Sequence, residues 1–148
     1  MEQVLIFRLG EELYALEVAH IQEVIEPPPY HYIPLAPAAF PGAINFHGNI
    51  LPVLDLGACL GFAAGQKNGR IIVLATSLCR LALAVTAIQR IVLLDADALL
   101  SSREDGRRAN CSRAVFSLDG EMINLLDAAQ LLASLEMTEM GTGGDHGT

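Results

Sequence analysis

The chain has 148 residues, of which 52% are apolar and 18% charged, a composition that favours a packed globular protein and excludes a disordered one. Its formal net charge of −8 disfavours phosphate-rich partners, so nucleic acid is not expected as a ligand. The sequence opens without a signal-peptide pattern, and its most apolar stretch, 71–85, contains Arg80 and is shorter than the roughly 20 residues that cross a bilayer. We therefore expect neither secretion nor membrane insertion.

The cysteines favour a reduced, cytoplasmic protein. Cys59, Cys79 and Cys111 are odd in number, widely spaced and set among apolar neighbours. This pattern fits neither a disulfide framework nor a metal site built from closely spaced cysteines.

One sequence plan occurs twice along the chain. Residues 14–25 match residues 81–92 without a gap at an offset of 67, and residues 42–60 match residues 114–132 at an offset of 72. Such self-similarity indicates an internal duplication, with halves at roughly 4–60 and 71–132. Because each half alone would bury too little apolar surface, we expect the halves to share one core within a single domain over residues 1–137.

The first elements are predicted to form an antiparallel hairpin from residues 4–9 and 13–17, joined at Gly10. Apolar side chains occupy both faces of 4–9, so this strand is expected to lie between two layers. Residues 18–25 have the spacing of a short helical turn that leads into an extended segment, with His20 exposed on the turn.

A proline-rich connection follows over residues 27–41, which we expect to run extended along the surface. Apolar and aromatic side chains are expected to hold it down, namely Tyr30, Tyr32, Ile33 and Leu35. A second hairpin is predicted from 43–46 and 50–54 around His47-Gly48-Asn49, and Pro52 favours an edge position for its second strand.

The second copy repeats these elements, with Asp119-Gly120 at the turn of its last hairpin. A helix is predicted over 127–135 with Asp127 as its N-cap, and the equivalent Asp55 is expected to cap a helix in the first copy. Residues 61–69 and 101–110 are predicted to be loops, and residues 138–148 a disordered tail.

No pattern in the sequence indicates catalysis. His20, His31 and His47 lack metal-ligand spacing, and no nucleophile motif or phosphate-binding loop occurs, so no cofactor, metal or enzymatic activity is expected. A small ligand-binding domain or a thiol enzyme, with Cys59 or Cys111 activated by a distant histidine, is the alternative that spacing alone leaves open.

Three motifs follow one another in order along the chain. They are Phe7-x-Leu9-Gly10-x-Glu12-x-Tyr14-Ala15-Leu16-x-Val18, then Ile21-Gln22-Glu23-Val24-Ile25, then Gly42-x-Ile44-Asn45-Phe46-x-Gly48-x-Ile50-Leu51-Pro52-Val53-x-Asp55-Leu56. Together they resemble the CheW family of chemotaxis coupling proteins. The resemblance covers residues 4 to about 135 and implies a mainly β fold of two intertwined five-stranded SH3-like β-barrels with short helices and a C-terminal helix. It further implies a non-catalytic adaptor that joins the cytoplasmic tip of methyl-accepting chemoreceptors to the regulatory domain of a CheA-type histidine kinase.

By matching positions, the resemblance implies a receptor groove between the barrels. Its residues would be Ile21, Glu23, Gly42, Asn45, His47 and Gly48, with Ile21, Val24 and Ile44 as apolar anchors unless these three belong only to the core.

Two positions of the presumed partner surface depart from the family pattern. His47 stands where the family has an arginine that pairs with the glutamate matched by Glu23, and Gly57 replaces a second arginine. Since a histidine offers fewer donors and only a partial charge near neutral pH, a Glu23–His47 pair should be weaker than the family's pair. We therefore expect a divergent, non-flagellar cluster, or alternatively a decoy that has lost the kinase or the receptor contact.

Overall fold

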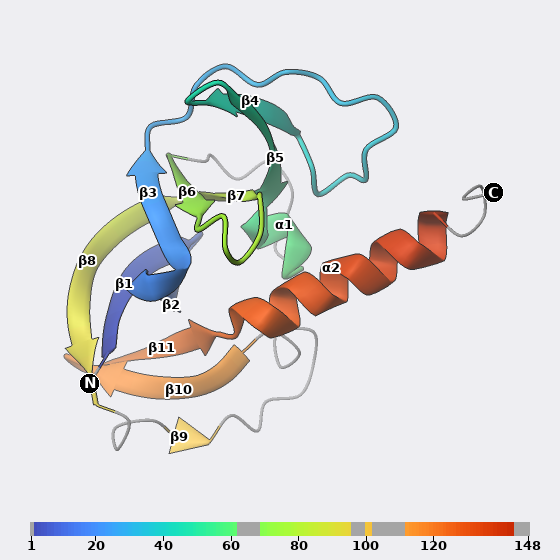
Figure 1. The fold of residues 1–148 in the computed structure, drawn as a ribbon. Coiled ribbons are helices and arrows are strands. Elements are labelled where there is room, and N and C mark those ends of the chain that lie inside the picture. The colour runs from blue at the N-terminus through green and yellow to red at the C-terminus, as the bar shows by residue number, and fades with distance from the viewer. Residues whose placement is uncertain (1, 62–68, 96–99, 102–111, 144–148) are drawn as a thin grey trace.

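Strands make up most of the described chain, which in this computed structural model comprises residues 2–61, 69–95, 100–101 and 112–143 (Figure 1). The elements of the first copy are β1 (Glu2–Leu9), β2 (Glu12–Glu17), the 3-10 helix η1 (Val18–His20), β3 (Ile21–Ile25), β4 (Gly42–Phe46), β5 (Asn49–Asp55) and α1 (Leu56–Cys59). The second copy supplies β6 (Arg70–Leu74), β7 (Ala82–Val85), β8 (Ala87–Leu94), β9 (Leu100–Ser101), β10 (Ser112–Leu118), β11 (Glu121–Leu126) and α2 (Ala128–Gly143).

The strands form two sheets, and each sheet takes strands from both copies. One has the order β8-β1-β2-β11-β10-β9 and the other β3-β6-β7-β5-β4. The first copy therefore donates its opening hairpin to one sheet and its closing hairpin to the other, as Figure 1 shows by the mixture of blue and orange strands in the lower sheet. The predicted architecture of two intertwined SH3-like β units is confirmed, with the two-residue β9 as a sixth strand at one edge.

The strand register reproduces the internal repeat. The two sheets are each joined at the centre by a parallel pair, β2 with β11 and β5 with β7. Leu125 lies opposite Ala15 in the first pair, and Val53 lies opposite Ala82 in the second. The two pairs are equivalent, because Ala15 aligns with Ala82 at the offset of 67 and Val53 aligns with Leu125 at the offset of 72. The duplication therefore extends to individual pairs of facing residues.

A central cluster of buried side chains joins the two sheets. Leu5, Phe7 and Leu9 of β1 belong to it, together with Ile72 of β6 and Leu83 of β7. Val4 and Ile6 alternate with these residues along β1, and their side chains belong to a separate cluster on the opposite face of the strand. Both faces of β1 are thus buried, as the sequence predicts, and the strand is held by burial on two sides.

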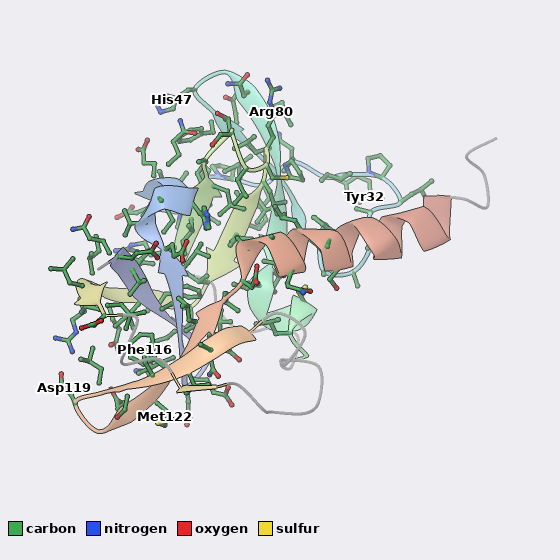
Figure 2. All side chains as sticks on the ribbon, turned by 60° about the horizontal axis from the view of Figure 1, so that its bottom comes forward. Tyr32, His47, Arg80, Phe116, Asp119 and Met122 are labelled. Carbon is green, nitrogen blue, oxygen red and sulfur yellow. The ribbon has the colours of Figure 1, made fainter. Side chains whose placement is uncertain are left out.

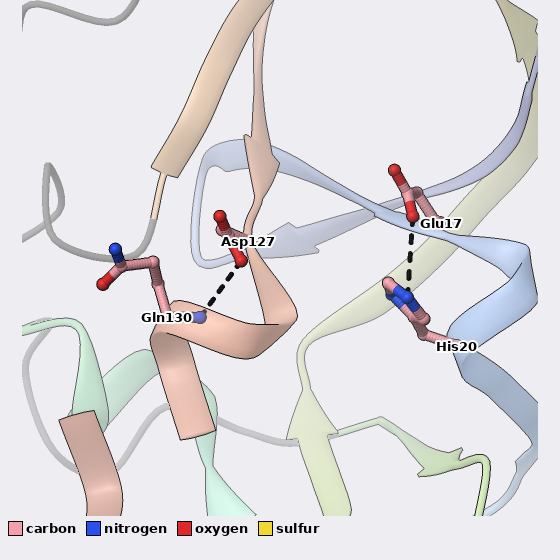
Figure 3. Close-up of polar contacts among 4 residues, drawn as sticks. All are labelled: Glu17, His20, Asp127 and Gln130. Atoms are coloured by element: carbon pink, nitrogen blue, oxygen red, sulfur yellow. Dashed lines mark hydrogen bonds and ion pairs between the residues drawn. The ribbon is translucent and has the colours of Figure 1, made fainter. Parts of the chain in front are cut away.

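Both predicted helix caps are confirmed. Asp55 accepts a hydrogen bond from the backbone N–H of Ala58 at 3.2 Å. Asp127 accepts one from the N–H of Gln130 at 3.0 Å (Figure 3). Each carboxylate satisfies a backbone donor that the first turn of a helix leaves unpaired, which explains why the repeat carries aspartate at both positions.

The edge position expected for the strand containing Pro52 is wrong, because β5 lies between β4 and β7. Ala43, the partner of Pro52, uses its N–H and C=O on His31, so Pro52 occupies a pair without mutual hydrogen bonds and its nitrogen points away from β4. β7 begins to pair with β5 only at Val53. An internal strand therefore tolerates this proline without losing a ladder bond.

The proline-rich segment is held differently from the prediction. Tyr32 is 82% exposed and Leu35 is 99% exposed, so neither ring nor isobutyl group anchors the segment. Tyr30 and Ile33 are half-buried, and backbone bonds between His31 and Ala43 fix the course of the chain. A β-bridge thus holds the segment in place, whereas the sequence predicts apolar contacts in that role.

At the C-terminal end, α2 runs to Gly143, well beyond the predicted end at Leu135 and into the segment expected to be a tail. Residues 144–148 lie outside the described residues, as do 62–68 and 102–111, which contain most of the two predicted loops. In the part of the chain that is described, no helix is long and apolar enough to cross a membrane.

Candidate partner-binding surface

The turn between β4 and β5 presents His47 and Gly48 to solvent. Both have positive φ, 50° and 84°, as expected for a two-residue turn that follows the right-handed twist of the hairpin. Asn45 stabilises this turn, because its Oδ1 accepts a hydrogen bond from the N–H of Gly48 at 3.0 Å. Asn45 and Gly48 therefore define the conformation in which His47 is displayed.

The predicted contact between Glu23 and His47 is present. Glu23 Oε1 lies 3.6 Å from His47 Nε2, with the side chains 48% and 70% exposed. A bulge in β3 between Ile21 and Glu23 changes the register there, and the ring of Phe46 contacts the imidazole edge-on at a centroid distance of 4.2 Å. At this exposure the pair contributes little to the stability of the fold, about 0–1 kcal/mol. The pair therefore matters here for its place on the surface and not for stability.

Only part of the predicted groove comes together on this surface. Glu23, Asn45, His47 and Gly48 gather around the hairpin tip, whereas Gly42 is buried at the far end of β4. A Cβ on Gly42 would lie 2.8 Å from the carbonyl oxygen of His31, so glycine is needed there for packing.

The proposed apolar anchors belong wholly or partly to the core. Ile44 is fully buried, while Ile21 and Val24 are half-buried and pack against the central cluster. Gly57 is buried within α1 and does not share the exposed surface of Glu23 and His47. The expectation that both departures from the family pattern alter that surface therefore holds for His47 alone.

A small pocket of about 90 Å³ lies beside the hairpin tip. Gln22, His47 and Arg80 are among its lining residues, and Figure 2 places Arg80 close to His47 at the same end of the molecule. Arg80 is exposed and has no ion-pair partner among the residues that the structure describes. The sequence gives no signal for this juxtaposition, because Arg80 stands in a turn whose place depends on the packing of β6 and β7.

Arg80 also borders a larger apolar pocket of about 490 Å³. Four parts of the chain form its wall: the proline-rich segment, β5, the turn before β7, and α2. The lining residues are Ile33, Ala36, Pro37, Phe40, Pro52, Leu78, Cys79, Leu81, Leu132 and Leu135. Cys79 lines this pocket without a histidine among the lining residues, an arrangement that does not fit an activated thiol.

The cysteines and His20 of the described residues have surroundings that suit a structural role. Cys59 and Cys79 are half-buried and not joined in a disulfide, and Cys111 lies outside the description. His20, expected to be exposed, is half-buried: its Nε2 lies 3.6 Å from Oε1 of Glu17, and its Nδ1 is buried without a hydrogen bond (Figure 3). Within the described ranges, no cluster of three or more metal-ligating side chains occurs.

The described fold is thus two interlocked β units with an exposed hairpin tip, at which Glu23 contacts His47. The family comparison is specific: the chain belongs to the CheW-like domain family, whose model matches residues 3–136. Members of this family are non-catalytic scaffolding proteins, and the chain is accordingly a CheW-like scaffolding protein of chemotaxis signalling.

Individual relatives match over nearly their whole length. Chemotaxis protein CheW of Rhizobium meliloti is 28% identical over 139 residues, covering 90% of this chain and 89% of its own. CheW of Thermotoga maritima is 26% identical over 138 residues, covering 93% and 91%. The crystal structure of the scaffolding protein TtCheW from Thermoanaerobacter tengcongensis superposes with a TM-score of 0.78 at 25% identity, covering 85% of this chain and 88% of that one.

Proposed function

We propose that the chain couples methyl-accepting chemoreceptors to a CheA-type histidine kinase in the cytoplasm, at receptor arrays. It would hold the receptor's cytoplasmic tip through the surface around Glu23 and His47, and the kinase's regulatory domain through a separate surface. The observation that carries this proposal is the Glu23–His47 contact itself, which joins β3 to the exposed tip between β4 and β5 at two positions that match the family's partner surface. A rigid adaptor of this kind raises the effective concentration of kinase beside receptor without any chemistry of its own.

The same surface suggests a divergent partner. Arginine offers a permanently charged fork of five donors, whereas the imidazole of His47 offers at most two. A receptor adapted to arginine at this position would therefore bind the present chain less tightly. We infer that the chain serves a chemosensory cluster other than the flagellar one, with a receptor suited to histidine.

The test compares the affinity of receptor-tip fragments, from flagellar and non-flagellar clusters, for the native chain and for His47→Arg. We expect His47→Arg to strengthen binding of flagellar-type tips by about three- to tenfold, the range that one added charged contact at an interface provides. Asn49→Arg is the matched control, because it adds the same charge to the same hairpin tip but not at the position that contacts Glu23.

Three outcomes distinguish a divergent partner, a decoy and the absence of a coupling role. Unchanged affinity for every receptor tip would remove the basis for a divergent partner. Binding of only the receptor or only the kinase domain would identify a decoy, and binding of neither would refute the coupling role altogether.

A further inference from the structure

The apolar pocket that Arg80 borders has the size of a small-molecule site. Its volume of about 490 Å³ falls within the roughly 300–1,000 Å³ that is typical of such sites. Two of its walls are the proline-rich segment and α2, and Figure 1 shows both extending on the same side of the molecule. The other walls come from β5 and the turn before β7, so the pocket depends on segments that are far apart in the sequence.

The apolar lining of the pocket is only partly covered by the protein. Leu81 belongs to the central cluster of buried side chains. Five further lining residues pack against that cluster and are half-buried: Phe40, Leu78, Cys79, Leu132 and Leu135. Each of them therefore keeps apolar surface that a ligand can cover, and removing that surface from water would stabilise the bound state.

Backbone hydrogen bonds hold two of the walls in place without a ligand. The N–H of Asp55 donates to the carbonyl oxygen of Ala39 at 2.7 Å, which fastens the proline-rich segment to the end of β5. The N–H groups of Leu78 and Cys79 both donate to the carbonyl oxygen of Ala75, at 2.9 and 3.0 Å, and close the turn before β7. Because these walls are already ordered, a ligand would lose little affinity to the ordering of loops.

Among the described residues that line the pocket, Arg80 is the one charged side chain. It is exposed and forms no ion pair with a described residue, so its guanidinium can bind an external acceptor. A guanidinium matches a carboxylate, to which it can donate two parallel hydrogen bonds. The net charge of −8 repels anions at long range, but salt screens that field beyond about 8–10 Å, whereas a direct contact with Arg80 acts within that distance.

We propose that this pocket binds a small amphiphilic carboxylate, with its carboxylate group on the guanidinium of Arg80 and its apolar body between the proline-rich segment and α2. A medium-chain fatty acid has both features. A helix of a partner protein suits the pocket less well, because a helix is about 10–12 Å wide and 490 Å³ would hold little more than one turn of it. The inference does not depend on the proposed coupling role.

The test is a calorimetric titration of the full chain with decanoate and with its uncharged analogue decanol. We expect saturable one-to-one binding of both, and an affinity for carboxylates that rises about threefold with each methylene from octanoate to decanoate. Arg80→Gln should weaken decanoate binding by about three- to tenfold and leave decanol binding unchanged. Arg70→Gln is the matched control, because it removes the same charge from an exposed arginine outside the pocket.

Two further measurements locate the ligand. Ala36 is a half-buried lining residue, so the ring of Ala36→Phe should fill the pocket and abolish binding of both compounds while the unfolding midpoint stays near that of the native chain. In the native chain, decanoate should slow the alkylation of Cys79 by iodoacetamide, read by mass spectrometry. Cys59 is also half-buried but lies outside the lining, so its alkylation should not change.

The inference would be overturned by decanoate binding that does not saturate, or that is the same in the native chain, Arg80→Gln and Ala36→Phe. Equal affinity for decylammonium, or equal protection of Cys59 and Cys79, would also overturn it. If the native chain does not bind decanoate and Ala36→Phe loses affinity for a receptor tip, the pocket belongs to a protein partner and the assignment to a small molecule is wrong.

Discussion

At the scale of single residues, Tyr30 is the side chain whose ionisation is most clearly linked to the fold. It sits in the proline-rich segment beside β4 and packs against the core of the second sheet. Burial raises the pKa of its phenol above the ordinary 10.0, and the carboxylate of Asp55 raises it further. Both effects oppose formation of a phenolate at this position.

This linkage predicts how stability changes at alkaline pH. The folded-state pKa of Tyr30 lies above the unfolded value, so its contribution is complete below about pH 10 and is lost as the pH rises through the folded pKa. Tyr30→Phe should flatten that decline when the free energy of urea unfolding is measured across pH 9 to 11. Tyr32→Phe is the matched control, since it removes a hydroxyl from an 82% exposed ring of the same segment. An unaltered alkaline slope in Tyr30→Phe would contradict the assignment.

Single residues also show where sequence reasoning succeeds and where it stops. Asp55 and Asp127 are predictable caps because the repeat places both at the same point before a helix. Local sequence patterns do not indicate the Arg90–Asp119 ion pair, although the offsets that align the two copies also align it with Glu23 and His47. Arg80 carries no such signal, because only tertiary packing brings its turn beside the first hairpin.

At the scale of elements, β4 depends on a glycine at each end, for two different reasons. Gly48 provides the positive φ of the turn and has open space around it, whereas Gly42 lies against the backbone of His31 and Cβ of Tyr30. A close approach of this kind cannot be read from local sequence. Gly42 allows the proline-rich segment to pair with β4.

The two glycines should therefore respond differently to substitution. Gly42→Ala introduces a Cβ 2.8 Å from the oxygen of His31 and 2.9 Å from Cβ of Tyr30, so the paired segment must shift. We expect a loss of about 1–3 kcal/mol in the free energy of urea unfolding, the usual cost of overpacking. Gly48→Asn should cost less than about 1 kcal/mol, because asparagine tolerates the left-handed conformation. Equal losses in the two variants would show that the close approach is not what Gly42 protects.

At the scale of the whole molecule, neither copy contains a complete sheet. The first copy supplies β1 and β2 to one sheet and β3, β4 and β5 to the other, and the parallel pairs at both centres join strands of different copies. The repeat predicts a shared core, and the central cluster drawn from both copies agrees with it. The order of strands within the sheets could not be derived from the repeat alone, because equivalent hairpins can pair within or between copies.

This interlocking predicts that the copies fold only together. Fragments 1–61 and 69–148, expressed separately, should each lack a cooperative thermal transition by circular dichroism, because each lacks the central partner of its strands. Mixing them in equal amounts should restore strand signal and a single transition. A cooperative transition of fragment 1–61 alone would show that its two hairpins form a core without the second copy.

The link between β2 and β11 also affects how the protein is made. Asn124 donates through Nδ2 to the carbonyl oxygen of Leu13, a contact that spans 111 positions of the chain. During translation, the opening hairpin leaves the ribosome long before its central neighbour β11 exists, and the backbone N–H and C=O groups along β2 lack that partner for the interval. Assembly of this sheet is therefore a late, post-synthetic step, and the growing polypeptide should be a substrate for chaperones that shield unpaired strands.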